Sequence, residues 1–128
     1  MGLRLEGIDH VALTVRDVAR SVAWYRETLG LERRHEEAWG DHPAVVCAGN
    51  TCLALFPCAA PAPGPPPDRN AIAMQHLAFR VDRTHFEKAQ AALREREITF
   101  QFQDHAISHS ITFSDPDGHR LEITTYEV

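Results

Sequence analysis

The sequence predicts an α+β fold built from two copies of one βαβββ module, and three observations support this. The order strand–helix–strand–strand–strand occurs twice along the 128 residues. The first strand of each copy carries a histidine, His10 or His76, and these lie 66 positions apart (76 − 10). A proline-rich stretch separates the copies. An internal repeat of this kind indicates a duplicated structural unit.

The first copy begins with a strand over residues 7–16, whose side chains alternate between two faces. Asp17 is a good N-cap for the helix that follows, in which apolar residues recur at helical spacing. Gly30 suits the C-terminal cap of that helix. A Gly49-Asn50 turn predicts a hairpin near the end of the module. The three remaining strands of this copy are expected at 31–39, 44–48 and 51–56.

Residues 57–70 hold six prolines and one glycine, a composition that excludes a central strand or a helix. We interpret this stretch as a linker that crosses the surface. The sequence therefore predicts one domain over 1–128. Module one is expected at about 5–57, the linker at about 58–70 and module two at about 71–128.

The second copy begins with a strand over residues 74–81, in which His76 and Arg80 share one face. We expect Arg80 to form a buried ion pair, with binding of an acidic substrate as the alternative. Thr84 and Glu87 have the spacing of a capping box at the start of the second helix. The last three strands are expected at 98–103, 110–113 and 120–126.

Composition limits the classes of partner. A net charge of −5 argues against nucleic acid and against an anionic membrane surface. No apolar run approaches the roughly 20 residues that cross a bilayer. The cysteines are odd in number and form no CxxC pair, so we expect no disulfide framework and a reducing, cytoplasmic location. They are Cys47, Cys52 and Cys58.

Three residues form a candidate metal site. His10 and His76 lie on the first strands of the two modules, and Glu122 lies in the closing strand of the second. Two imidazoles and one carboxylate on inward strand faces provide three fixed ligands and leave other positions open. The open positions would let a small molecule chelate the metal through adjacent oxygens.

Two such modules, these three residues and a characteristic closing hairpin resemble the vicinal oxygen chelate family. The most specific stretch is Phe113-Ser114-Asp115-Pro116-Asp117-Gly118-His119-Arg120-Leu121-Glu122. Family members include glyoxalase I, extradiol dioxygenases, fosfomycin-resistance enzymes, methylmalonyl-CoA epimerase and bleomycin-binding proteins. The resemblance implies curled sheets that form a half-open barrel around one divalent metal. It also implies a small-molecule substrate and a homodimer.

One position separates the subfamilies. Members with four protein ligands carry a further carboxylate in the closing strand of the first module, where this chain has Ala54. Ala54 has no donor atom, which argues against glyoxalase I and against the epimerase. The resemblance then implies the Fe(II) of extradiol dioxygenases as the first choice of metal, with Mn(II), as in fosfomycin-type enzymes, or Zn(II) as alternatives.

The loop at residues 104–108 resembles an extradiol dioxygenase loop, which implies that His105 is an acid or base near the metal. Two features argue against ring cleavage: Thr112 stands where those enzymes carry tyrosine, and the linker lacks their upstream histidine. The fosfomycin-type alternative lacks cationic groups between Gln101 and His119 to hold a phosphonate. We therefore expect an extradiol-type dioxygenase first. The alternatives are a fosfomycin-type lyase or transferase and a metal-free antibiotic-binding protein.

Overall fold

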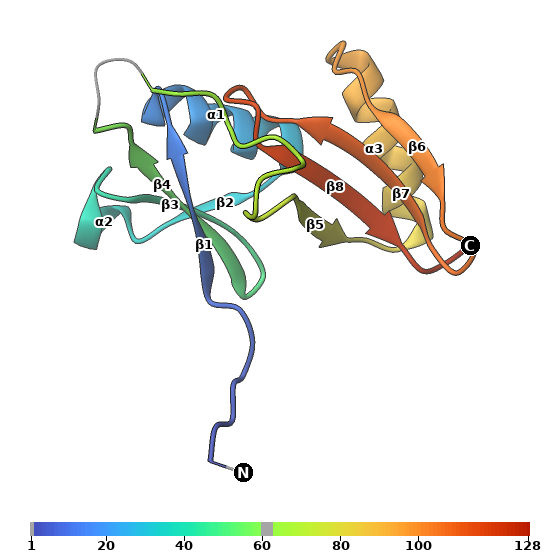
Figure 1. Ribbon diagram of the computed structural model, residues 1–128, viewed down its shortest axis with the longest axis horizontal. Helices are drawn as coiled ribbons and strands as arrows, with labels where there is room; N and C mark the ends of the chain where they lie inside the picture. The colour runs from blue at the N-terminus through green and yellow to red at the C-terminus, as the bar shows by residue number, and fades with distance from the viewer. Residues whose placement is uncertain (1, 60–62) are drawn as a thin grey trace. The chain divides into compact units, whose positions relative to one another are not determined.

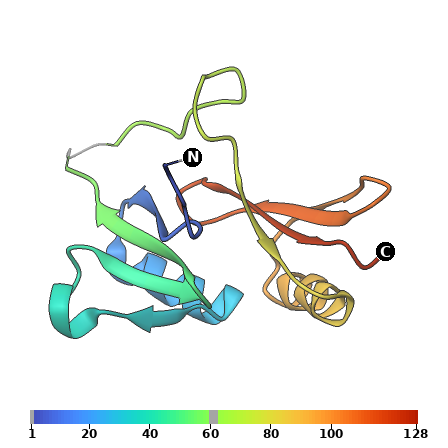
Figure 2. The same ribbon diagram turned by 90° about the horizontal axis from the view of Figure 1, so that it is seen from below.

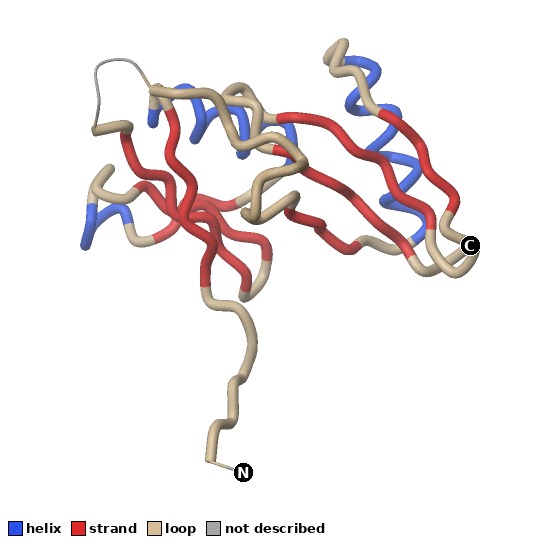
Figure 3. The backbone as a smooth tube through the Cα atoms, viewed as in Figure 1, coloured by secondary structure: helices blue, strands red, loops and turns tan. Residues whose placement is uncertain are grey.

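The computed structural model describes residues 2–59 and 63–128. The chain divides into a first unit that ends at Pro63 and a second that begins at Gly64, a boundary inside the predicted linker. Each unit contains a four-stranded sheet and one long helix (Figures 1 and 3). The predicted α+β fold of two βαβββ modules is therefore confirmed. The half-open barrel, which concerns how the two sheets combine, stays a prediction.

The first unit has the strand order β1-β4-β3-β2, with β1 parallel to β4 and the other neighbours antiparallel. The side chain of Asp17 accepts a hydrogen bond from the backbone N–H of Arg20 at 3.0 Å, and Gly30 has a φ of 70°, so both predicted caps of the first helix are confirmed. The elements are β1 (His10–Val15), α1 (Val18–Leu29), β2 (Glu32–Arg34), α2 (Glu36–Trp39), β3 (Ala44–Ala48) and β4 (Thr51–Pro57).

The predicted strand over 31–39 is wrong in its second half. Strand β2 ends at Arg34, and His35 adopts a left-handed backbone with a φ of 62°. A residue in that conformation cannot continue a strand. The acidic pair Glu36 and Glu37 then begins the short helix α2, where negative charge favours a helix N-terminus.

The expectation of no disulfide framework also fails, because the structure contains a disulfide. Cys47 in β3 and Cys52 in β4 are direct cross-strand partners and form a disulfide. The two-residue turn at Gly49-Asn50 places them opposite each other, an effect that motif spacing and an odd count do not detect. Cys58 is a free thiol. The cysteine argument for a reducing compartment therefore no longer holds.

The second unit repeats the strand order of the first, as β5-β8-β7-β6. Its helix is capped by Asp82, which accepts a hydrogen bond from the backbone N–H of His85 at 2.8 Å. The predicted capping box of Thr84 and Glu87 is therefore wrong, and Glu87 instead pairs with Arg83 at 2.9 Å. The elements are β5 (Leu77–Arg80), α3 (Arg83–Glu95), β6 (Gln101–Asp104), β7 (His109–Ser114) and β8 (Arg120–Thr125).

The two faces of the second sheet have different roles. On one face, Leu121 and Ile123 of β8 are buried on the side of α3, where Phe86 and Leu93 are also buried. On the other face lie the alternating polar residues of β8, including Glu122. Figure 2 shows α3 on one side of this sheet and the segment that leads into β5 on the other. Across residues 2–59 and 63–128, no helix has the length and apolar character needed to span a membrane.

Candidate metal and substrate site

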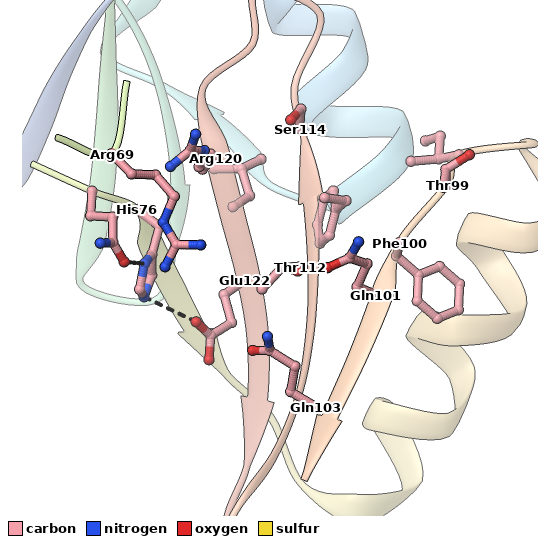
Figure 4. A pocket seen from close by; sticks show the side chains of 14 residues that line it. Arg69, His76, Thr99, Phe100, Gln101, Gln103, Thr112, Ser114, Arg120 and Glu122 are labelled. Atoms are coloured by element: carbon pink, nitrogen blue, oxygen red, sulfur yellow. Dashed lines mark hydrogen bonds and ion pairs between the residues drawn. The ribbon is translucent and has the colours of Figure 1, made fainter. Parts of the chain in front are cut away.

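A cavity of about 650 Å³ lies on the polar face of the second sheet. Side chains from β6, β7 and β8 line it, together with residues that precede β5 (Figure 4). Its ionisable residues are Arg69, His76, Arg120 and Glu122. The cavity therefore contains two of the three predicted metal ligands.

His76 and Glu122 come from neighbouring strands and contact each other directly. Glu122 lies in β8 opposite Ala78 of β5, and His76 immediately precedes β5. The Nε2 atom of His76 is 3.0 Å from the Oε2 atom of Glu122, and only 14% of the Glu122 side chain is exposed. The prediction places both residues in one site, and the structure brings them together.

The other nitrogen of the His76 ring also has a polar contact. Its Nδ1 atom lies 3.2 Å from the Gln75 Oε1 atom, an acceptor. The Nε2 atom faces the Glu122 carboxylate at 3.0 Å. An imidazole nitrogen and a carboxylate oxygen held this close together form a donor pair that suits a divalent metal.

His10 in the first unit is held in the same way. It begins β1, and its Nδ1 atom is 2.9 Å from Asp9 Oδ2. A carboxylate on one ring nitrogen fixes the tautomer and leaves Nε2 to ligate a metal, as is common in metal sites. Both candidate histidines are thus oriented by the side chain of the preceding residue, Asp9 or Gln75.

The predicted triad draws on both units, so the sharing of one metal by all three ligands stays a prediction. Among the residues that the structure describes, no cluster of three or more His, Cys, Asp and Glu side chains has a geometry able to hold a metal ion. His10 belongs to the first unit, whereas His76 and Glu122 belong to the second.

Two arginines in the cavity were missed by the sequence reasoning. Arg120 begins β8 opposite Ser114, and strand alternation places it on the face of Glu122, a signal that could have identified it. Arg69 lies in a turn in which Asp68 accepts a hydrogen bond from the backbone N–H of Asn70 at 2.8 Å. Figure 4 shows both guanidinium groups on the same side of the sheet as the His76–Glu122 pair.

The linker segment reaches the closing hairpin of the second unit. A Cβ added at Gly118 would lie 3.1 Å from Cγ of Pro66, and Gly118 has a φ of +89° that favours glycine. This close approach fixes the course of the chain shortly before Arg69. No local sequence pattern would have predicted that contact.

Arg80 does not form the predicted buried ion pair. The residue is exposed, and its guanidinium carbon lies 4.6 Å from the centre of the Tyr126 ring. A cation–π contact at the surface replaces the expected pair, because β5 is short and ends at Arg80.

His105 lies in the turn between β6 and β7. The residue is exposed, and its Nε2 atom is 3.2 Å from Ser110 Oγ. It is not among the described residues that line the cavity, whereas Thr112, which pairs with Glu122, is. The acid–base role of His105 therefore stays a prediction.

Comparisons with known proteins find relatives that cover nearly the whole of this chain. The chain is 30% identical over 119 residues to the glutathione transferase FosA of Serratia marcescens, covering 93% of this chain and 80% of that protein. It is 29% identical over 117 residues to the catechol-2,3-dioxygenase of Bacillus subtilis, covering 91% of this chain but 40% of that protein. A solved glyoxalase/dioxygenase structure from Nostoc punctiforme superposes with a TM-score of 0.82 at 25% identity, covering 96% of this chain and 92% of that one.

A family model matches residues 7–123, which include all three candidate metal ligands and both modules. The chain therefore belongs to the Glyoxalase/Bleomycin resistance protein/Dioxygenase superfamily.

Proposed function

We propose that this chain is a divalent-metal-dependent enzyme that transfers a thiol to a small anionic substrate. One observation carries the proposal: Arg69 and Arg120 line the same cavity as the His76–Glu122 pair. Two guanidinium groups beside a metal-ligand pair suit a substrate that has both a negative charge and chelating oxygens. The similarity to a protein named glutathione transferase supports a thiol as the second reactant.

In this proposal His10, His76 and Glu122 hold the metal. The metal supplies Lewis-acid polarisation of the substrate oxygens that bind it. Mn(II) is our first choice for this reaction because the substrate adds oxygen ligands to the site. Fe(II) and Zn(II) are compatible with the same three side chains.

The arginines orient the substrate. A guanidinium donates two parallel hydrogen bonds to a phosphonate or carboxylate, which fixes direction as well as position. The sequence argument against a phosphonate considered only positions between Gln101 and His119, and both arginines lie outside that interval. Thr112 adds a polar side chain to the cavity beside Glu122.

Ring cleavage by an extradiol-type dioxygenase is the second candidate. The similarity to a catechol-2,3-dioxygenase favours it, and two histidines with one carboxylate suit Fe(II). Catechols are neutral near pH 7 and make less use of two arginines, and exposed His105 lies outside the cavity lining. A metal-free binding protein is the third candidate, and metal uptake separates it from both enzymes.

The decisive experiment compares two loaded forms of the protein. The Mn(II) form is incubated with fosfomycin, an anionic epoxide, and with glutathione or cysteine. The Fe(II) form, loaded without oxygen, is then mixed with catechols in air. We expect a thiol adduct by mass spectrometry in the first reaction only. A yellow ring-fission product without any adduct would overturn the proposal in favour of the dioxygenase.

A matched pair of variants tests the anion site. Arg120→Gln removes a charged hydrogen-bond donor, typically worth about 1.5–3 kcal/mol. This corresponds to a loss of roughly 10–150-fold in kcat/KM for the anionic substrate. Arg96→Gln, at the exposed end of α3, is the control and should leave kcat/KM unchanged. Equal activity of the two variants would show that Arg120 does not bind substrate.

A further inference from the structure

We propose that Cys52 is a redox-controlled metal ligand. Reduction of the Cys47–Cys52 disulfide would free the Cys52 thiol to bind the same metal as His10. This inference rests on the metal site proposed above and concerns a residue to which that proposal gives no role.

The pairing of β1 with β4 places Cys52 beside His10. The two strands are parallel, and His10 is the register partner of Cys52. Neighbouring strands lie about 4.8 Å apart, and register partners direct their side chains to the same face. The side chains of Cys52 and His10 therefore leave the sheet on the same face, about one strand spacing apart.

The disulfide involves the same face of the first sheet. Cys47 is the antiparallel partner of Cys52 and is 2% exposed, whereas Cys52 is half-buried. Of the two cysteines, Cys52 is therefore the one more open to solvent and to a reductant. While the disulfide is intact, neither sulfur can act as a thiolate ligand.

The internal repeat supports a functional position for Cys52. Ala12 pairs with Ala54 in the first unit, as Ala78 pairs with Glu122 in the second. Two residues earlier on the closing strand stand Cys52 and Arg120 respectively. Arg120 lines the cavity that contains His76 and Glu122. The first unit therefore carries a sulfur at the position where the second carries a cavity arginine.

The chemistry balances with a dithiol reductant. Thiol–disulfide exchange breaks the Cys47–Cys52 S–S bond, transfers two electrons and two protons to the protein, and oxidises the reductant to its own disulfide. The Cys52 thiol then gives its proton to solvent when its sulfur binds the metal. A thiolate favours Zn(II) and Co(II) over Mn(II), so reduction would change the preferred metal.

The experiment uses Co(II), because sulfur ligation gives a near-ultraviolet charge-transfer band. All proteins carry Cys58→Ser, which removes the free cysteine. Oxidised and dithiol-reduced proteins are titrated with Co(II) and with Zn(II), along with Cys47→Ser and Cys52→Ser. We expect the band, and at least tenfold tighter Zn(II) binding, in the reduced protein and in Cys47→Ser. Cys52→Ser should show neither, with or without reductant.

The outcomes separate the two proposals. Co(II) binding of equal strength in both redox states without the band would overturn the role of Cys52 and leave the metal site standing. A band that persists in Cys52→Ser would also overturn it. Failure of any form to bind Co(II), Zn(II) or Mn(II) would overturn the proposed function itself.

Discussion

The two units have the same framework but present different side chains at equivalent positions. Both sheets have the same order of strands, and each unit has a histidine at the start of its first strand or immediately before it, in contact with the side chain of the preceding residue. The closing strands differ. The first unit carries small or disulfide-bonded residues where the second carries charged ones: Ala54 against Glu122, and Cys52 against Arg120.

In the second sheet, the buried core and the polar cavity lie on separate faces. Leu53 and Leu121 occupy equivalent positions between those residues, and both are buried. Because strand alternation separates the faces, one face can change its chemistry while the packing of the other is kept. The second unit carries two of the proposed metal ligands and both cavity arginines, whereas the first carries one proposed ligand.

The largest expected effect comes from Glu122→Gln, which keeps the shape of the side chain but removes its negative charge. Loss of a group that only hydrogen-bonds to a metal ligand typically lowers metal affinity by about 10–100-fold. Loss of a ligand charge in Glu122→Gln should lower the affinity by more than that. Calorimetric titration with Mn(II) measures it, and Glu95→Gln at the exposed end of α3 is the control. Unchanged affinity in Glu122→Gln would remove Glu122 from the site.

The equivalence of the two cores can be tested with Leu53→Ala and Leu121→Ala. Both side chains are fully buried, at 1% and 0% exposure, so each substitution should lower the free energy of unfolding by about 2–5 kcal/mol. Denaturant unfolding measures the change, and Leu3→Ala, in an exposed segment, should have little effect. A negligible cost for one of the two leucines would show that the cores are not equivalent.

The shared orientation of the histidines is tested by Asp9→Ala and Gln75→Ala. Each removes the side chain that contacts a ring Nδ1. Loss of such a partner typically lowers metal affinity by about 10–100-fold. Metal titration of both variants, with circular dichroism as a check on folding, measures the effect. If one variant keeps wild-type metal affinity, the side chain that it lacks does not orient the neighbouring histidine for metal binding.

The smallest effect concerns the cap of α3. The backbone N–H of His85, and then its ring, hold the pKa of the Asp82 carboxyl below its ordinary value of 3.8. A carboxyl with a lowered pKa stabilises the folded state at pH values above its ordinary pKa. This contribution is lost as the pH falls through the lowered pKa. Asp82→Ala should therefore lower Tm near neutral pH, by an amount that shrinks in acid. A difference in Tm that is independent of pH would contradict the charged cap.

Patterns local in sequence predicted much of the fold. Strand β3 begins and ends where the sequence predicted it, at 44–48, and both caps of α1 follow from Asp17 and Gly30. The repeat and the closing hairpin placed His76 and Glu122 in one candidate site, and the structure brings these two side chains into contact. These features depend on residues close in sequence or on the internal repeat, and both can be recognised in the sequence alone.

The features that were missed depend on pairing across the chain. The Cys47–Cys52 disulfide follows from strand register. The end of the strand at His35 follows from a left-handed backbone conformation that a histidine side chain does not predict. Arg69 reaches the cavity because the linker contacts the closing hairpin at Gly118. Such contacts are set by tertiary structure, so motif reasoning does not detect them.

The central claim is that His10 of the first unit shares one divalent metal with His76 and Glu122 of the second. Equilibrium dialysis against Mn(II), followed by elemental analysis, tests it most directly. We predict about one ion per chain for the wild type and for His85→Ala, whose ring contacts Asp82 outside the site, with loss of the ion in His10→Ala. Full retention of the ion by His10→Ala, or no binding by the wild type, would contradict the claim.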